Sequence, residues 1–302
     1  MALTVEEVIA RIPAWARASR IATSQLHGGI TNRNYRVDVD GESFVVRIGG
    51  EGAEFLGIDR AQECGCTRAA HQTGVAPEVV HFLPEAGVLV TRFIHGRQLS
   101  VEDLRSEATF RRAAQSIRRI HDGPDFPGSF SSFRTVEQYL TISQHHHAPL
   151  PPNIEDLFRC AAEIERAMAR GSGITRPCHN DLLAANFIDD GALVRVLDWE
   201  YAGMGEVFFD LSNFAANQEF SERQDELLLE IYFRSVSEPL LARLRLMKVM
   251  SDLREAMWAM VQTGISALDF DFPAYGRKHF ARCTAAVESD GFGRWLAQAS
   301  RG

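Results

Sequence analysis

One polar segment constrains this chain more than any other, the eight residues His179-Asn180-Asp181-Leu182-Leu183-Ala184-Ala185-Asn186. Asp181 is followed five positions later by Asn186. A second Asp begins the triplet Asp198-Trp199-Glu200 further along the chain. Residues 186–188 and 193–197 read as two short strands around the turn sequence Asp189-Asp190-Gly191, which predicts a β-hairpin. We expect this hairpin to bring the Asn and the second Asp, at the outer ends of its strands, together beside the first Asp.

These three side chains are the ones that a phosphoryl-transfer site requires. A carboxylate such as Asp181 can accept the proton of an attacking hydroxyl group. Mg²⁺ prefers oxygen ligands, so Asn186 and Asp198 can hold it against the phosphates of a nucleotide. Taken singly, each residue could be an ordinary turn or helix-capping residue, but the combined spacing favours a site. The sequence therefore predicts Asp181 as the catalytic base, Asn186 and Asp198 as metal ligands, and ATP and Mg²⁺ as cofactors.

The letters around this site distinguish it from a related pattern. Protein kinases carry H-R-D-x-x-x-x-N followed by D-F-G. This chain carries H-N-D-x-x-x-x-N followed by D-W-E. The spacing within the loop is the same and the flanking letters differ, which favours a kinase of small molecules over a kinase of proteins.

Two further residues are predicted to support the loop without taking part in the chemistry. His179 precedes the base, and we expect its side chain to hold the loop by hydrogen bonds. Asp210 lies in the apolar run Phe208-Phe209-Asp210-Leu211. A buried carboxylate needs hydrogen-bond partners, and the backbone N–H groups of residues 179–181 are the expected donors.

A nucleotide site is predicted on the N-terminal side. The turn Gly28-Gly29-Ile30-Thr31-Asn32 lies between two predicted strands, and adjacent glycines let backbone N–H groups approach phosphates closely. A plain hairpin turn is the alternative reading. Arg47 ends a strand and Glu63 lies on the helix that follows; as an ion pair they would fix a cation on the phosphates. Otherwise they are a surface Arg and a solvated helix Glu.

The chain divides into a sheet-rich and a helix-rich part. Alternating apolar residues and the turn Asp40-Gly41 predict antiparallel strands in the first part, followed by one long helix and a further strand pair. After residue 94 helical spacing predominates. The strands are expected at 21–26, 34–39, 43–48, 79–83 and 88–93, and the helices at 58–72, 101–121, 154–169 and from 208 onward. We expect an α+β fold of two lobes, a small five-stranded antiparallel N-terminal lobe (1–94) and a larger, mostly helical C-terminal lobe (95–302).

Composition excludes some classes of protein. A formal net charge of −8 argues against a general nucleic-acid binder, which usually carries a basic excess. Five scattered cysteines predict free thiols in a reducing cytoplasm. No run of about 18 apolar residues occurs, so no insertion into a membrane is expected.

Residues for the acceptor are harder to assign. Glu200 and Tyr201 directly follow the metal Asp, and Trp258 lies on the predicted helix of residues 254–262. Aromatic faces and acidic groups hold a quaternary ammonium. A Trp on an amphipathic helix is more commonly a core residue, so the spacing alone favours that reading for Trp258.

The sequence resembles the choline/ethanolamine kinase family, within the aminoglycoside-phosphotransferase-like kinases, from about residue 20 to residue 270. The matching segments are Gly28–Asn32, Val46-Arg47-Ile48, Glu63, Cys178–Leu183 with Asn186-Phe187, Asp198–Gly203 and Phe209-Asp210-Leu211.

The resemblance implies a protein-kinase-like fold with ATP between its lobes and adenine contacted by the backbone near Thr91, Phe93 and Ile94. It also implies that Trp258 contacts the acceptor. The expected acceptor is the hydroxyl group of a small cationic alcohol, choline first and ethanolamine second. Thiamine, an aminoglycoside or another sugar is the alternative within the same fold, and a nucleotide-binding pseudoenzyme is the alternative outside catalysis. A homodimer is left open.

Overall fold

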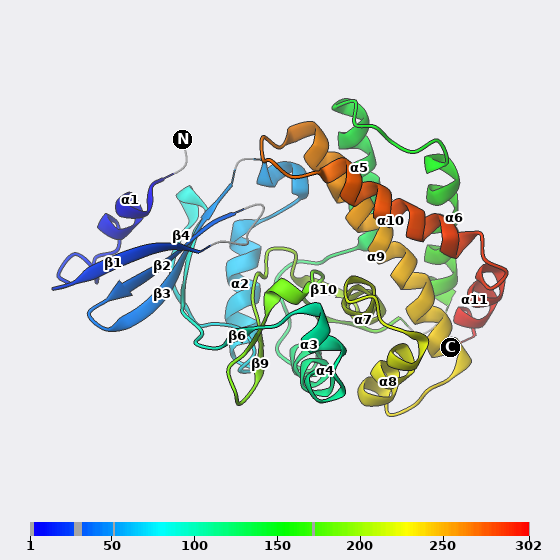
Figure 1. Ribbon diagram of the computed structural model, residues 1–302, viewed down its shortest axis with the longest axis horizontal. Helices are drawn as coiled ribbons and strands as arrows, with labels where there is room; N and C mark the ends of the chain where they lie inside the picture. The colour runs from blue at the N-terminus through cyan, green and yellow to red at the C-terminus, as the bar shows by residue number, and fades with distance from the viewer. Residues whose placement is uncertain (1–2, 27–31, 51, 171–172, 302) are drawn as a thin grey trace.

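The computed structural model describes residues 3–26, 32–50, 52–170 and 173–301. Its N-terminal part is built on a five-stranded antiparallel sheet with the strand order β1-β2-β3-β5-β4 (Figure 1). Asp40 and Gly41, which join β2 to β3, have φ angles of 48° and 93°, as a two-residue hairpin turn requires. The strands are β1 (Ile21–Leu26), β2 (Asn32–Val39), β3 (Glu42–Gly49), β4 (Val79–Leu83) and β5 (Val88–Arg92).

The sheet buries one face against the N-terminal segment. One buried valine from each of three strands, Val37, Val46 and Val90, lies on this face. They pack with Val8 of α1 (Val5–Ala10) and with Trp15. The long helix α2 (Arg60–His71) lies between the sheet and the helical part of the molecule (Figure 1). It begins at Asp59, whose side chain accepts two backbone N–H groups of the first turn. The predicted sheet and helix are therefore confirmed.

The remainder is mostly helical, with two departures from the predicted boundaries. The helix expected over 101–121 is two helices, because Ser106 adopts an extended backbone and its hydroxyl donates to the carbonyl of Asp103. A further helix begins directly after Ser131, between the helices expected at 101–121 and 154–169, where no helix was predicted. The helices are α3 (Val101–Arg105), α4 (Glu107–His121), α5 (Ser132–His145), α6 (Ile154–Arg170), α7 (Val207–Asn217), α8 (Glu222–Phe233), α9 (Glu238–Ile265), α10 (Phe272–Val287) and α11 (Phe292–Ala299).

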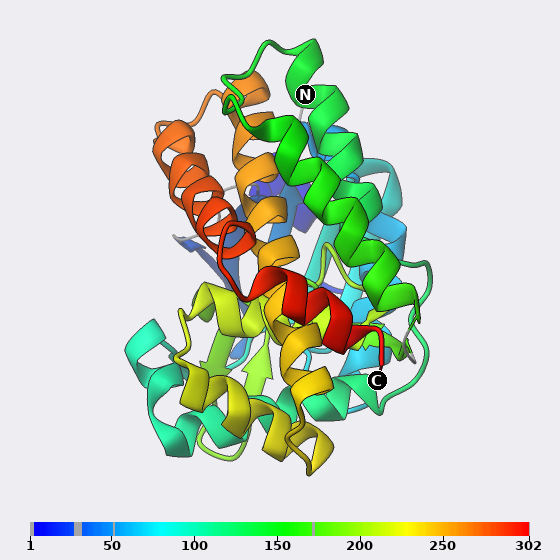
Figure 2. The same ribbon diagram turned by 90° about the vertical axis from the view of Figure 1, so that its right-hand side faces the viewer.

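Helix α9 is the centre of this part. It has 28 residues and is buried along nearly its whole length, because α5, α7, α10 and α11 pack around it (Figures 1 and 2). Pro239 lies in its first turn, where a missing N–H costs nothing. Among the described residues, none of the helices is long and apolar enough to cross a membrane.

Short strands carry the polar segment. The predicted hairpin forms as β8 (Phe187–Asp189) and β9 (Val194–Val196), with β6 (Arg97–Gln98) beside β8. Phe187 is paired with Val196, so the residues that flank this pair are brought close together. A second antiparallel pair, β7 (Thr175–Cys178) with β10 (Gly203–Glu206), lies next to it and was not expected. Short 3₁₀ helices cover Ala53–Leu56, Pro84–Ala86 and Ala184–Asn186.

Candidate active site

A buried carboxylate on α7 holds the polar segment after β7. Oδ2 of Asp210 accepts the backbone N–H of His179 at 3.0 Å, and Oδ1 accepts that of Asn180 at 2.7 Å. Nε2 of His121 donates to the same carboxylate at 2.8 Å. Burial favours a higher pKa for Asp210, but these donors outweigh it and leave the pKa below its usual value. The structure thus places Asp210 under the loop backbone, where the sequence led us to expect it.

The partners of His179 define its protonation. Its Nε2 is bonded to the carbonyl oxygen of Leu197 at 2.8 Å, and a carbonyl can only accept, so Nε2 carries the proton. Its Nδ1 accepts the backbone N–H of Asp181 at 3.2 Å. Burial lowers the pKa of His179, so the ring is neutral. It packs edge-on against Trp199 with ring centroids 4.7 Å apart. His179 therefore ties the loop to the end of β9.

Asp181 lies where two groups of charges meet. Its side chain is almost buried, and Oδ1 accepts from Nη1 of Arg254 on α9 at 3.0 Å. Burial raises the pKa of Asp181 to about 7; Arg254 opposes this rise, while the charges of Glu255 and Asp198 add to it. The carboxylate is therefore held in one orientation and is easily protonated near neutral pH.

Asn186 and Asp198 lie at the outer ends of the β8–β9 hairpin, after the loop that carries Asp181. Nδ2 of Asn186 donates to the backbone oxygen of Asp181 at 2.9 Å, so the amide oxygen is the atom that could coordinate a cation. Asp198 has a φ angle of 63°, in the left-handed region that Asp tolerates better than most residues. About a third of its side chain, 32%, is exposed. The two residues thus present oxygen atoms of the kind that Mg²⁺ prefers.

The N-terminal part contributes two arginines to this region. Arg47 of β3 forms an ion pair with Glu63 of α2, and its Nη1 donates to Oδ1 of Asp198 at 2.8 Å. Nη1 of Arg60, one turn before Glu63, contacts Glu63 at 2.9 Å and Glu200 at 3.0 Å. Burial would raise the pKa of Glu200, but Arg47 and Arg60 outweigh it and lower the pKa. The sheet is thereby joined to the segment after β9 by buried charges.

Asn32 completes this cluster. Its Nδ2 donates to Oε2 of Glu200 at 2.9 Å, and its Oδ1 accepts from Nη2 of Arg60 at 2.8 Å. Gly28, Gly29 and Thr31, also predicted to contact phosphates, lie outside the described residues.

The segment predicted to meet adenine follows β5. Thr91 is buried and paired with Val45 and Val79 of the neighbouring strands. The ladder ends at Arg92, after which the N–H of Phe93 still donates to the carbonyl of Ser43 at 2.9 Å. Ile94 is the next residue and is half-buried. The chain therefore leaves the sheet at this point on its way to the helical part.

Helix α9 presents a charged and aromatic turn to Asp181. Nη1 of Arg254 donates to Oε1 of Glu255 at 2.6 Å as well as to Asp181, and its guanidinium lies 4.3 Å from the ring centroid of Tyr201. The Tyr275 hydroxyl donates to Oε2 of Glu255 at 2.9 Å. Trp258, one turn further along, packs edge-on against Tyr275 at 5.9 Å. Tyr201 and Trp258 thus lie on the side of Asp181 that faces α9.

The predicted acceptor residues are not all brought together. Tyr201 and Trp258 share the α9 side, whereas Glu200 is bonded to Arg60 and Asn32 on the sheet side. Arg60, Arg254, Glu255 and Tyr275 were not predicted. The readable signal was the charged pair Arg254-Glu255 directly before the apolar run of residues 256–261, because buried charges require partners.

Comparisons with known proteins identify relatives of this chain. A model of the phosphotransferase enzyme family matches residues 22–247. The crystal structure of a choline/ethanolamine kinase family protein from Mesorhizobium loti superposes with a TM-score of 0.84 at 33% identity, covering 97% of each chain. Ethanolamine kinase 2 of Rattus norvegicus is 26% identical over 294 residues, or 87% of this chain and 75% of that protein. Protein LicA of Haemophilus influenzae is 26% identical over 212 residues, which are 68% of this chain but only 61% of LicA.

The family match extends from β1 into α9 and includes the whole polar segment with its hairpin. The 33% identical relative is covered along almost its entire length. This chain therefore belongs to the phosphotransferase enzyme family and, within it, to the choline/ethanolamine kinases.

Proposed function

We propose that the protein transfers the γ-phosphate of ATP to the hydroxyl group of choline, with ethanolamine as the second candidate, in a reaction that requires Mg²⁺. The observation that carries the proposal is the position of Asp181. Asp181 is bonded to Arg254 of the aromatic turn of α9. Its pKa is also raised by the charge of Asp198, which is bonded to Arg47 of the sheet. A base at such a junction can serve an acceptor and a nucleotide at once.

The donor set fits Mg²⁺. Asn186 offers an amide oxygen because its nitrogen is engaged by the backbone of Asp181, and Asp198 offers a partly exposed carboxylate. When bound, the ion would neutralise the phosphate charge. Arg47, held by Glu63, is the proposed cation for the nucleotide phosphates. Backbone groups near Thr91, Phe93 and Ile94 are the proposed contacts for adenine.

Asp181 is the proposed base. Its pKa of about 7 suits a group that takes a proton near neutral pH. The bond from Arg254 keeps the carboxylate oriented, and the backbone bonds to Asp210 keep the loop in place. The hydroxyl group of the acceptor would approach from the α9 side.

An ammonium group fits the α9 side. Trp258 and Tyr275 supply aromatic rings, and Glu255, which accepts the Tyr275 hydroxyl, supplies a carboxylate beside them. Tyr201, also predicted for the acceptor, has its ring covered by Arg254. A quaternary ammonium gains most from such faces, which is why choline is the first candidate. We assign Glu200 to the arginine cluster that holds Arg60 rather than to the acceptor. Five free thiols are in keeping with a cytoplasmic setting for this activity.

The test is ADP release with choline, ethanolamine, thiamine and an aminoglycoside, each with and without Mg²⁺. Turnover of either amino alcohol is expected, and its absence would refute the assignment. Turnover confined to thiamine or the aminoglycoside would support the alternative acceptors. Binding of Mg²⁺-ATP without turnover of any acceptor would support a pseudoenzyme. Asp181→Ala should abolish turnover and leave binding of a non-hydrolysable ATP analogue nearly unchanged.

Trp258→Leu separates the two amino alcohols. It should raise KM for choline about tenfold or more and KM for ethanolamine less, because the methylated ammonium relies more on aromatic faces. The matched control is Trp295→Leu, which changes a Trp of α11 that packs against Arg245. An equal effect of both substitutions on KM for choline would exclude Trp258 from the acceptor site.

A further inference from the structure

A hollow of about 780 Å³ lies at the C-terminal ends of α4 and α8, apart from the residues assigned to the reaction. The two helices run beside each other in both views (Figures 1 and 2), and Nη1 of Arg118 joins them by donating to the carbonyl of Tyr232 at 2.7 Å. We call this hollow the arginine pocket; its lining includes Arg118, Arg119, Asp122, Tyr232, Phe233 and Arg234.

The charges of the arginine pocket are unbalanced. Nε of Arg118 is bonded to Asp122 at 2.6 Å, and its guanidinium covers the ring of Tyr232, so Arg118 has a structural use. Arg119 and Arg234 are exposed, and within the described parts of the chain no carboxylate lies at ion-pair distance from either. A basic residue at the end of a helix often serves the helix dipole. Both arginines lie at such ends, Arg119 in the last turn of α4 and Arg234 at the cap of α8. Neither donates to a carbonyl or a carboxylate of the described residues, so the N–H groups of both stay available to an anion.

The wall of the pocket is connected to the catalytic loop. The hydroxyl of Tyr232 is bonded to Nδ1 of His121 at 2.7 Å, and Nε2 of His121 donates to Asp210. Asp210 in turn accepts the backbone N–H groups of His179 and Asn180. All these side chains are buried, so a displacement of the Tyr232 ring changes hydrogen bonds that hold the loop of the proposed base.

We propose that the arginine pocket binds a small organic phosphomonoester, and that its occupancy alters turnover through Tyr232 and His121. Guanidinium groups pair with phosphate oxygens in a bidentate manner, and Arg119 and Arg234 are the two available for this. The half-buried side chains of Ile231 and Phe233 offer apolar surface for the organic part. The volume exceeds that of a phosphate ion, which favours an organic ester over inorganic phosphate.

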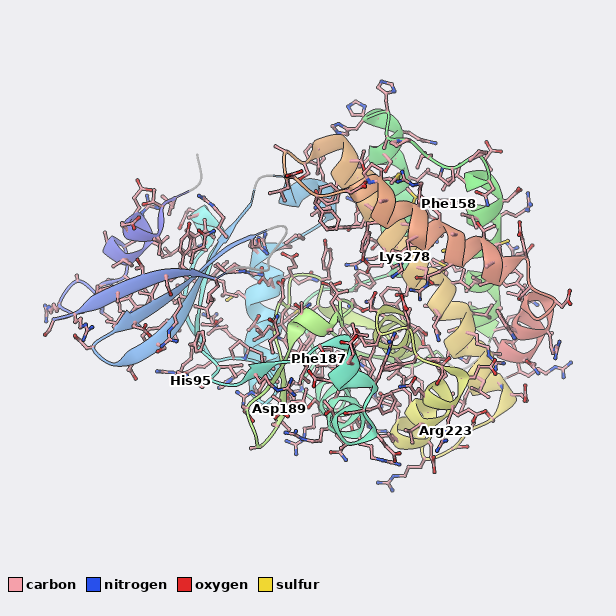
Figure 3. The ribbon with its side chains drawn as sticks, viewed as in Figure 1. His95, Phe158, Phe187, Asp189, Arg223 and Lys278 are labelled. Carbon is pink, nitrogen blue, oxygen red and sulfur yellow. The ribbon has the colours of Figure 1, made fainter. Side chains whose placement is uncertain are left out.

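Binding is tested with phenyl phosphate by titration calorimetry. The protein of residues 1–302 is first saturated with Mg²⁺ and a non-hydrolysable ATP analogue, so that the proposed nucleotide site is occupied. Wild type should bind one equivalent, and Arg119→Ala/Arg234→Ala should bind at least tenfold more weakly. The control Arg166→Ala/Arg223→Ala removes two exposed arginines elsewhere, Arg223 lying in the first turn of α8 (Figure 3), and should change affinity less than twofold. Equal losses in both double variants, or no binding by wild type, would overturn the site.

The proposed effect of pocket occupancy on turnover is tested with Tyr232→Phe. This substitution keeps the ring and removes the hydroxyl that His121 contacts. Saturating phenyl phosphate should change kcat/KM of wild type at least fivefold. Tyr232→Phe should bind the probe as wild type does but lose this response. A response equal to that of wild type, or no response in wild type, would refute the connection. The calorimetric arm needs no turnover, so its result is independent of the proposed acceptor.

Discussion

Replacing Glu255 by Gln tests the electrostatic account of Asp181. Nη1 of Arg254 donates to Asp181 at 3.0 Å and to Glu255 at 2.6 Å, so the two carboxylate oxygens lie at most about 5.6 Å apart. At an effective dielectric constant of about 20, two unit charges at this separation repel each other by about 3 kcal/mol, the equivalent of about two pH units. The amide keeps the shape of the side chain and removes this repulsion.

The expected result is a shift of the acid limb of kcat. The proposed base Asp181 must be ionised to accept a proton, and burial raises its pKa, so wild-type kcat should fall on the acid side of its pH profile. In Glu255→Gln the ionised form is favoured, because a negative charge is gone and Arg254 is left to Asp181 alone. The limb should therefore move to lower pH by between about one and two units.

The assay is kcat from about pH 5 to pH 9 at saturating acceptor and Mg²⁺-ATP, which separates the effect on the base from any loss of acceptor affinity. The control is Tyr275→Phe, which removes the hydroxyl bonded to Glu255 but leaves the charge, and its acid limb should stay in place. An acid limb that is unmoved in Glu255→Gln, or that moves to higher pH, would refute the reasoning.

Three further predictions concern other parts of the molecule. Asp210→Asn replaces an acceptor of three N–H bonds by a single amide oxygen and should lower the free energy of unfolding by about 3 kcal/mol in urea denaturation; a loss under about 1 kcal/mol would contradict it. Arg47→Met should weaken binding of a non-hydrolysable ATP analogue about tenfold, and Arg47→Lys less, in a fluorescence titration; unchanged affinity would remove Arg47 from the nucleotide site. Burial raises the pKa of Cys66 to about 12, so a thiol reagent at about pH 8 should label half-buried Cys160 well before Cys66, and simultaneous labelling in peptide mass spectra would be inconsistent with the fold.

The parts of the site that could be predicted are local in sequence. Asp181, Asn186 and Asp198 lie within one loop and one hairpin, so spacing and turn chemistry alone determine their approach. The same holds for the sheet, where β1 covers the predicted residues 21–26 and β2 joins β3 through Asp40-Gly41. These features depend only on residues that are close together in the sequence.

The remainder depends on distant partners. Arg254 reaches Asp181 from 73 residues away, and Arg60 reaches Glu200 from 140 residues away, distances over which no spacing rule operates. Strand β7 contains Pro177 and β10 is half glycine, so neither has strand propensity, and each forms because the other is beside it. Glu200 was assigned to the acceptor by its place after Asp198, but position along the chain does not show which way a side chain points.

One turn of α9 carries Arg254, Glu255 and Trp258 together. Redesign of the proposed acceptor site for a different alcohol would substitute residues on that turn, where Arg254 and Glu255 also act on the pKa of Asp181. Substitutions on this turn are therefore expected to change the acceptor preference and the pH optimum together. A variant library screened at a single pH will discard enzymes that accept the new alcohol but work in another pH range, so the screen must be run across pH.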